Sequence, residues 1–193
     1  CAVVLCDMRM GRYHLFGRGW RTEWSRFREI VRIGLPIGLI VLAEGGLFNA
    51  ATFLMGLIGP AQLAGHALAF QVAALAFQVP FGVGQAATIR VGYHFGAGNP
   101  AAIGRAGWAA LLVGIAFSLF AASAMLLFPR LILSAYVAVD APANSAMVGF
   151  ALQFILVAAA FHLFDAVQTV AGGVLRGLQD TRMPMVLAIL GYW

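Results

Sequence analysis

The chain has 193 residues, of which 62% are hydrophobic and only 10% are charged, and all twelve of its basic residues are arginine. Globular domains have about 25% charged residues, so polar groups cannot cover the apolar surface of this chain and lipid must be its main solvent. In lipid every backbone polar group needs an internal partner, which leaves helix bundles and closed barrels. The apolar runs are continuous rather than alternating, so we predict an all-α integral membrane protein, a transmembrane helix bundle.

The N-terminal part is predicted to lead into the membrane bundle. Residues 1–8 have the composition of the end of a transmembrane helix. A basic stretch follows at 9–32, where aromatic and aliphatic residues recur at helical spacing with arginines between them. This pattern predicts a basic cytoplasmic loop with an interfacial amphipathic helix. An ordinary solvated linker is the alternative.

Residues 33–193 are predicted to form the transmembrane lobe. A bilayer core of about 30 Å needs about 20 apolar residues in a helix. Runs of this length cover about 33–58, 62–90, 101–128 and 145–175, and a fifth run at 184–193 is about half as long. Pro80 predicts a kink in the second span, because proline removes one backbone hydrogen bond. The first residues and the short last run predict a fragment of a larger membrane protein, truncated at both ends.

The arginines predict how the lobe is oriented. The segments 9–32, 90–105 and 176–183 contain or are flanked by arginines, whereas 59–61 has none and Arg130 stands alone in the remaining turn. Arginines between apolar spans act as topology signals. The three basic segments are therefore expected on the cytoplasmic side, and nucleic acid is not expected as a partner.

Two acidic residues lie inside the predicted spans. Glu44 is twelve residues after Arg32, and Asp165 is eleven residues before Arg176. At 1.5 Å per residue these separations are about 18 and 17 Å from the same membrane face, so both carboxylates should lie near the bilayer midplane. A carboxylate at that depth costs about 2.5 kcal/mol or more and usually marks an ion path. The alternative is two unrelated acids, each capped by a hydroxyl or amide of a neighbouring helix.

Further polar residues share helix faces with each other or with Asp165. Gln71, Gln78 and Gln85 are seven residues apart and therefore lie on one face of the second span, either as the wall of a wet cavity or as hydrogen-bonding contacts to another helix.

His162 lies one turn before Asp165, and Gln168 and Thr169 lie one turn after it. His162 can couple to the titration of Asp165. The more frequent alternative is a neutral histidine bonded to a backbone carbonyl or to water.

Three segments resemble the multidrug and toxic compound extrusion (MATE) family of antiporters. They are RIGLPIGLIVLAEGGLFNAATFLMGLIG, LAGHALAFQVAALAFQVPFGVGQAATIRVGYHFGAGNP and FDAVQTVAGGVLRGLQDTRMPM, in this order. The resemblance implies the C-terminal six-helix lobe of a twelve-helix transporter, with the four complete spans as helices seven to ten. It also implies secondary active efflux of drugs or cations, by antiport with H⁺ or Na⁺, in the bacterial inner membrane.

By this resemblance, Glu44 corresponds to the helix-seven acid and Asp165 to the helix-ten acid of the cation-coupling site. Many members have Gln where this chain has His162, and some have Tyr at Phe77, whose hydroxyl would help to hold an ion. This chain therefore offers fewer oxygen ligands, which favours H⁺ over Na⁺. No cofactor or other metal is expected beside the coupling ion.

The implied partners are the lipid bilayer, a small amphipathic or cationic substrate, and the N-terminal half of the same transporter. Two alternatives remain: a lipid or polysaccharide flippase of related architecture, which would have a larger cationic cavity, and a fragment that is inactive without its N-terminal half. An enzyme is not expected, because no catalytic motif surrounds Glu44 and Asp165.

Overall fold

A computed structural model describes residues 23–192 of the chain. Its elements, in order, are α2 (Trp24–Ile58), α3 (Pro60–Gly96), α4 (Pro100–Leu127), α5 (Pro129–Ser134), the 3-10 turn η2 (Pro142–Asn144), α6 (Ser145–Gly177) and α7 (Arg182–Tyr192). Proline opens α3, α4 and α5, at the first helical position, where its missing N–H would have no partner within the helix.

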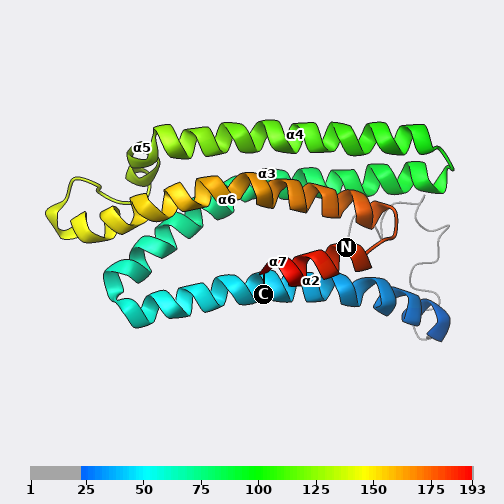
Figure 1. The fold of residues 1–193 in the computed structure, drawn as a ribbon, viewed down its shortest axis with the longest axis horizontal. Coiled ribbons are helices and arrows are strands. Elements are labelled where there is room, and N and C mark those ends of the chain that lie inside the picture. The colour runs from blue at the N-terminus through cyan, green and yellow to red at the C-terminus, as the bar shows by residue number, and fades with distance from the viewer. Residues whose placement is uncertain (1–22, 193) are drawn as a thin grey trace, which may run out of the picture.

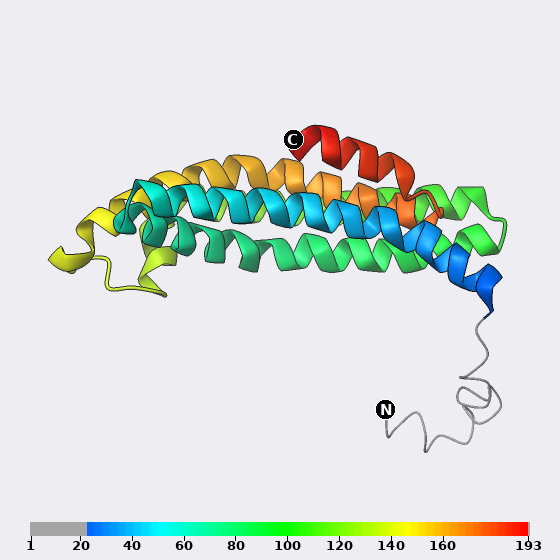
Figure 2. The ribbon, with the colours of Figure 1, turned by 90° about the horizontal axis from the view of Figure 1, so that it is seen from below.

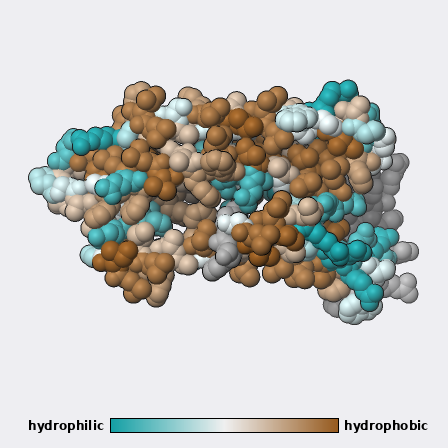
Figure 3. All heavy atoms as spheres, viewed as in Figure 1, coloured by the Kyte–Doolittle hydropathy of each residue, from teal (hydrophilic) through white to brown (hydrophobic). Residues whose placement is uncertain are grey.

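Four helical segments are long and apolar enough to cross a membrane: α2, α3, α4 and the segment Pro142–Gly177 that contains α6. They run up and down beside one another (Figure 1). The face seen in Figure 3 is hydrophobic along most of its length, and hydrophilic residues gather toward its two ends. The predicted all-α membrane class is therefore confirmed.

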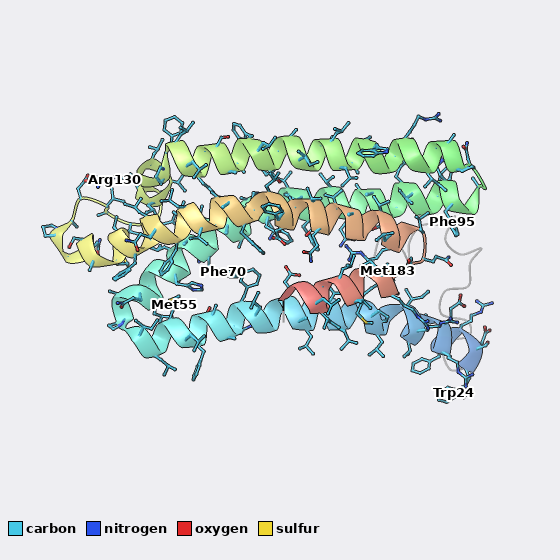
Figure 4. The ribbon with its side chains drawn as sticks, in the orientation of Figure 1. Trp24, Met55, Phe70, Phe95, Arg130 and Met183 are labelled. Carbon is cyan, nitrogen blue, oxygen red and sulfur yellow. The ribbon has the colours of Figure 1, made fainter. Side chains whose placement is uncertain are left out.

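The turns of the bundle gather at two opposite ends (Figure 1). The start of α2, the α3–α4 turn and the α6–α7 turn lie at one end, which we call the basic end. The α2–α3 turn, α5 and η2 lie at the other, where Arg130 is found (Figure 4). The basic end carries Arg26, Arg28, Arg32, Arg90, Arg105, Arg176 and Arg182. Basic and arginine-poor segments of the sequence thus alternate between the two ends.

The start of α2 differs from the prediction of a loop ending at residue 32. Residues 24–32 are the first part of α2 itself, exposed and continuous with the apolar span, and Arg26 pairs with Glu23 at 2.6 Å. Residues 24–32 are thus helical without a break from the span, since no glycine or proline interrupts the helix before Gly34, and an interfacial position for them stays a prediction. Residues 1–22, including the predicted helix end at 1–8, lie outside the described residues.

The other boundaries differ by smaller amounts. Helix α3 continues six residues beyond the predicted end of its span, to Gly96. Helix α5 occupies part of the segment expected to be a loop. Figure 1 shows that α3 changes direction along its length, and Pro80 lies inside it and is fully buried.

Helices α3 and α6 run parallel and approach each other through glycines. A Cβ added to Gly84 would lie 3.1 Å from the carbonyl oxygen of Thr169, and one added to Gly177 would lie 2.8 Å from that of Thr88. The Thr88 hydroxyl donates a hydrogen bond to the carbonyl oxygen of Gly173 at 2.8 Å, across the interface. In lipid, helices associate through close packing and such hydrogen bonds, which explains why this pair makes the most extensive contact in the bundle.

Helix α4 joins this pair, whereas α2 is held more loosely. Gly107 and Gly114 of α4 face Val174 and Val170 of α6, so α4 runs antiparallel to α6. Helices α3, α4 and α6 therefore form a three-helix unit. Helix α2 packs against α3 and α7 at its side (Figures 1 and 2), and Pro36 is its one buried residue.

We predict that Gly173→Ala destabilises the bundle, because the new Cβ would collide with the backbone of Gly84. Overpacking of this kind costs about 1–3 kcal/mol. Thermal unfolding of the full-length protein in detergent should show a lower midpoint for this variant.

Gly172→Ala is the matched control, because a Cβ there meets nothing within 4 Å and alanine favours helix by up to about 1 kcal/mol over glycine. Equal midpoints for the two variants would contradict the close α3–α6 contact.

Candidate functional site

The structure brings Glu44 and Asp165 together from two helices that are far apart in sequence. Glu44 lies on α2 and is half-buried, and Asp165 lies on α6 with 9% of its surface exposed. The carboxyl groups are close enough for the charge of Glu44 to act on Asp165. Because the two charges are alike, they repel each other across the boundary between α2 and the three-helix unit.

Helix α3 contacts both helices and gives a common scale for the depth of the two acids. The rings of Phe48 in α2 and Phe70 in α3 lie 5.3 Å apart, and Phe70 points toward α2 (Figure 4). Because α2 and α3 are antiparallel, Glu44, one turn before Phe48, lies level with about residue 74 of α3.

On the other side, Gly84 of α3 faces Thr169 of the parallel helix α6. Asp165, one turn before Thr169, is therefore level with about Pro80. At 1.5 Å per residue, the two carboxylates differ by about 9 Å in depth. Both thus lie in the middle part of the spans.

Within residues 23–192, neither carboxylate forms an ion pair with a basic side chain. The one ion pair in this part of the chain joins Arg26 to Glu23. The same residues contain no group of three or more His, Cys, Asp and Glu side chains that could hold a metal ion. A low-dielectric environment and a nearby like charge both disfavour two ionised carboxylates. A proton bound to either carboxylate would relieve the repulsion.

Two further polar groups are buried at about the depth of Asp165, one on α6 and one on α4. His162 is 3% exposed and its Nε2 atom has no hydrogen-bond partner among the described residues. A buried histidine usually forms a hydrogen bond to a backbone carbonyl. The Nε2 atom of His162 forms none within the described residues. On α4, Ser118 is fully buried and its hydroxyl also has no partner there.

The position of Ser118 follows from the α4–α6 contact. Gly114 faces Val170, and the helices are antiparallel, so Ser118 lies level with Ala166, next to Asp165. Ser118 was not among the residues identified from the sequence. Its one distinguishing feature in the sequence is a hydroxyl inside an apolar span. Ser123 has the same feature but is exposed, so the sequence does not tell the two serines apart.

The predicted glutamine row lies apart from the buried pair. Gln71, Gln78 and Gln85 are all exposed on α3. No hydrogen bond from them to another helix is present within residues 23–192, so the described lobe does not use them as interhelical contacts. On α6, Gln168 is exposed and Thr169 is half-buried, with its carbonyl oxygen turned toward Gly84.

The chain was compared with known proteins. The family model MatE matches residues 36–193. A probable multidrug resistance protein NorM of Mesorhizobium japonicum is 47% identical over 192 residues, which are 100% of this chain and 41% of that protein. A protein of the same name from Brucella suis is 46% identical over 99% of the chain and 41% of its own length.

The multidrug resistance protein NorM of Burkholderia vietnamiensis is 41% identical over 94% of the chain and 39% of its own length. The chain therefore spans about two fifths of the length of the curated relatives it matches.

We predict that Ser118→Ala leaves the stability unchanged or raises it. A buried hydroxyl without a partner costs about 1–3 kcal/mol, and alanine removes that cost in a site of nearly the same shape. The measurement is the unfolding midpoint of the full-length protein in detergent, with Ser123→Ala as the exposed control. A clear fall for Ser118→Ala alone would mean that the hydroxyl is bonded after all.

Proposed function

The chain belongs to the MatE family, which consists of transporters rather than enzymes, and on this premise we propose that it is the part of a multidrug efflux antiporter that carries the coupling-cation site. The observation that carries the proposal is the pair Glu44 and Asp165. Two carboxylates from separate spans lie in the middle part of the bundle, without a basic partner in residues 23–192. The names of the NorM relatives support drugs as the transported class.

The position of the pair suggests how a cation is coupled to movement. Asp165 belongs to the three-helix unit, whereas Glu44 belongs to α2, which is held more loosely. With both acids ionised, repulsion favours separation of α2 from α6; with a proton or cation bound, this repulsion is lost. Cation binding can therefore bias one arrangement of the spans over another, as alternating access requires.

The side chains around the pair favour H⁺ as the coupling ion. A Na⁺ site needs several oxygen ligands, because hard cations prefer oxygen. Phe77 supplies none, and its ring packs against that of Phe81 with a centroid distance of 6.1 Å. His162 offers a nitrogen atom at the buried face. Na⁺ bound by Glu44 and Asp165 remains the second candidate, and no other cofactor is proposed.

A lipid or polysaccharide flippase of related architecture is the alternative function, and the names of the NorM relatives favour drug efflux over it. Because the chain spans about two fifths of its relatives, transport is proposed for the full-length protein, which contains the further helices. Its several apolar spans make it a multi-pass membrane protein, and the bacterial relatives support the inner membrane.

We predict that Asp165→Asn abolishes drug efflux driven by a pH gradient, and that Glu44→Gln does the same or nearly so. Each amide is close in shape to the acid but cannot bind and release a proton. Efflux would be measured with the full-length protein in vesicles, with the pH and Na⁺ gradients imposed separately. Both variants should insert into the membrane, because each change removes a buried charge.

Asp140→Asn is the matched control. Asp140 is an exposed acid in the segment before η2, and its replacement should leave efflux unchanged. Wild-type efflux by Asp165→Asn in the absence of Na⁺ would refute the coupling role. A loss of Na⁺-driven efflux only would instead identify Na⁺ as the coupling ion.

We further predict that the basic end faces the cytoplasm. Cysteines placed at the exposed positions Ala101 and Met183 should react with a membrane-impermeant maleimide only from the cytoplasmic side, because arginine-rich ends stay inside. A cysteine at Ala143, exposed at the opposite end, should react only from outside. The reverse labelling pattern would overturn this orientation.

A further inference from the structure

A groove of about 590 Å³ lies between α3 and α4 at the basic end. Three of its lining residues carry basic side chains: Arg90 and His94 on α3, and Arg105 on α4. No acidic residue lines it, and neither arginine forms an ion pair with an acid in the described part of the chain. The polar part of the groove is therefore positively charged and lacks a counter-charge.

The remainder of the groove is apolar. Alanines of both helices line its walls, and Val83 and Val113 lie farthest from the basic end. Eleven residues separate Val83 from His94, which is about 16 Å along the helix. The groove thus has a cationic end at the level of the membrane surface and an apolar part that extends into the span.

The groove opens on the outer side of the α3–α4 pair. The residues of α3 and α4 that contact α6, among them Gly84 and Gly114, lie about a third of a turn around each helix from the groove-lining residues, given 3.6 residues per turn. None of the other described helices lines it. It is therefore separate from the Glu44–Asp165 pair, which lies between α2 and α6.

We propose that this groove binds an anionic phospholipid of the membrane leaflet at the basic end. The phosphate group lies between the guanidinium groups of Arg90 and Arg105, which bind phosphate oxygens through charge-assisted hydrogen bonds. One acyl chain lies along the alanine-lined part. Basic pockets between membrane helices recognise anionic headgroups in this way, and the continuous apolar wall distinguishes a lipid from a free phosphate ion.

The test is lipid binding to the full-length protein, measured by native mass spectrometry during titration with phosphatidylglycerol. Phosphatidylcholine with the same acyl chains is the zwitterionic comparison, because its choline cation offsets the charge of its phosphate. The double variant Arg90→Gln/Arg105→Gln should bind phosphatidylglycerol roughly 30-fold more weakly, because each arginine's hydrogen bonds to the phosphate contribute a factor of about five. Binding of phosphatidylcholine, whose choline group is repelled by the basic groove, should fall by less.

Arg28→Gln/Arg32→Gln is the matched control, since it removes two exposed arginines from the same end of the molecule. It should retain wild-type binding of phosphatidylglycerol. Equal losses in the two double variants would show a general surface-charge effect and overturn the site. Unchanged binding in Arg90→Gln/Arg105→Gln would overturn it as well, as expected if other helices of the full-length protein cover the groove.

A second variant, Ala109→Phe, keeps both arginines but fills the apolar part of the groove, which Ala109 lines. It should weaken binding of phosphatidylglycerol several-fold. If the double variant does not fold, this single variant is sufficient to test the lipid site. Inorganic phosphate is the third probe. Saturable phosphate binding that matches that of the lipid and is insensitive to Ala109→Phe would assign the groove to a soluble anion and refute the lipid site.

Discussion

The close approach of α3 and α6 is the contact on which the rest of the bundle depends. In lipid there is no hydrophobic force to press helices together, so the distance between backbones decides how well they pack. Gly84, Gly173 and Gly177 allow the two backbones to meet, and the hydroxyl of Thr88 bonds across the interface. This contact fixes the register of α6 against α3 and thereby the depth of Asp165.

The two acids lie on opposite sides of the weakest boundary in the described bundle. Helices α3, α4 and α6 interlock through glycines, whereas α2, which carries Glu44, buries Pro36 alone. A charge difference at this boundary acts where the least packing energy opposes a shift. One acid lies on the three-helix unit and the other on the loosely held helix α2. In the proposed mechanism, cation binding at these acids would therefore move α2 relative to the three-helix unit.

The sequence was sufficient to predict features that depend on length and composition. Long apolar runs identified the spans, and two acids within them identified Glu44 and Asp165. It did not identify Ser118 or the Arg90–Arg105 groove, because both depend on which faces of the helices meet. Helices that are apolar on all sides carry no periodic pattern to indicate those faces. The start of α2 is hidden for another reason: residues 24–32 have helical spacing but are polar, so composition alone places the beginning of the span at residue 33.

The exclusive use of arginine has a consequence for the proposed proton-coupled transport. A guanidinium keeps its charge over the whole physiological range of pH, whereas the amine of lysine loses its proton more readily in apolar surroundings. The side chains that hold the bundle at the membrane surface, including Arg90 and Arg105, are therefore insensitive to the acidity on either side. In the proposed proton-driven antiport the acids and histidines would change charge with pH, whereas the arginines at the basic end would not. The contacts of the basic end with the membrane would therefore stay the same while the coupling site gains and loses a proton.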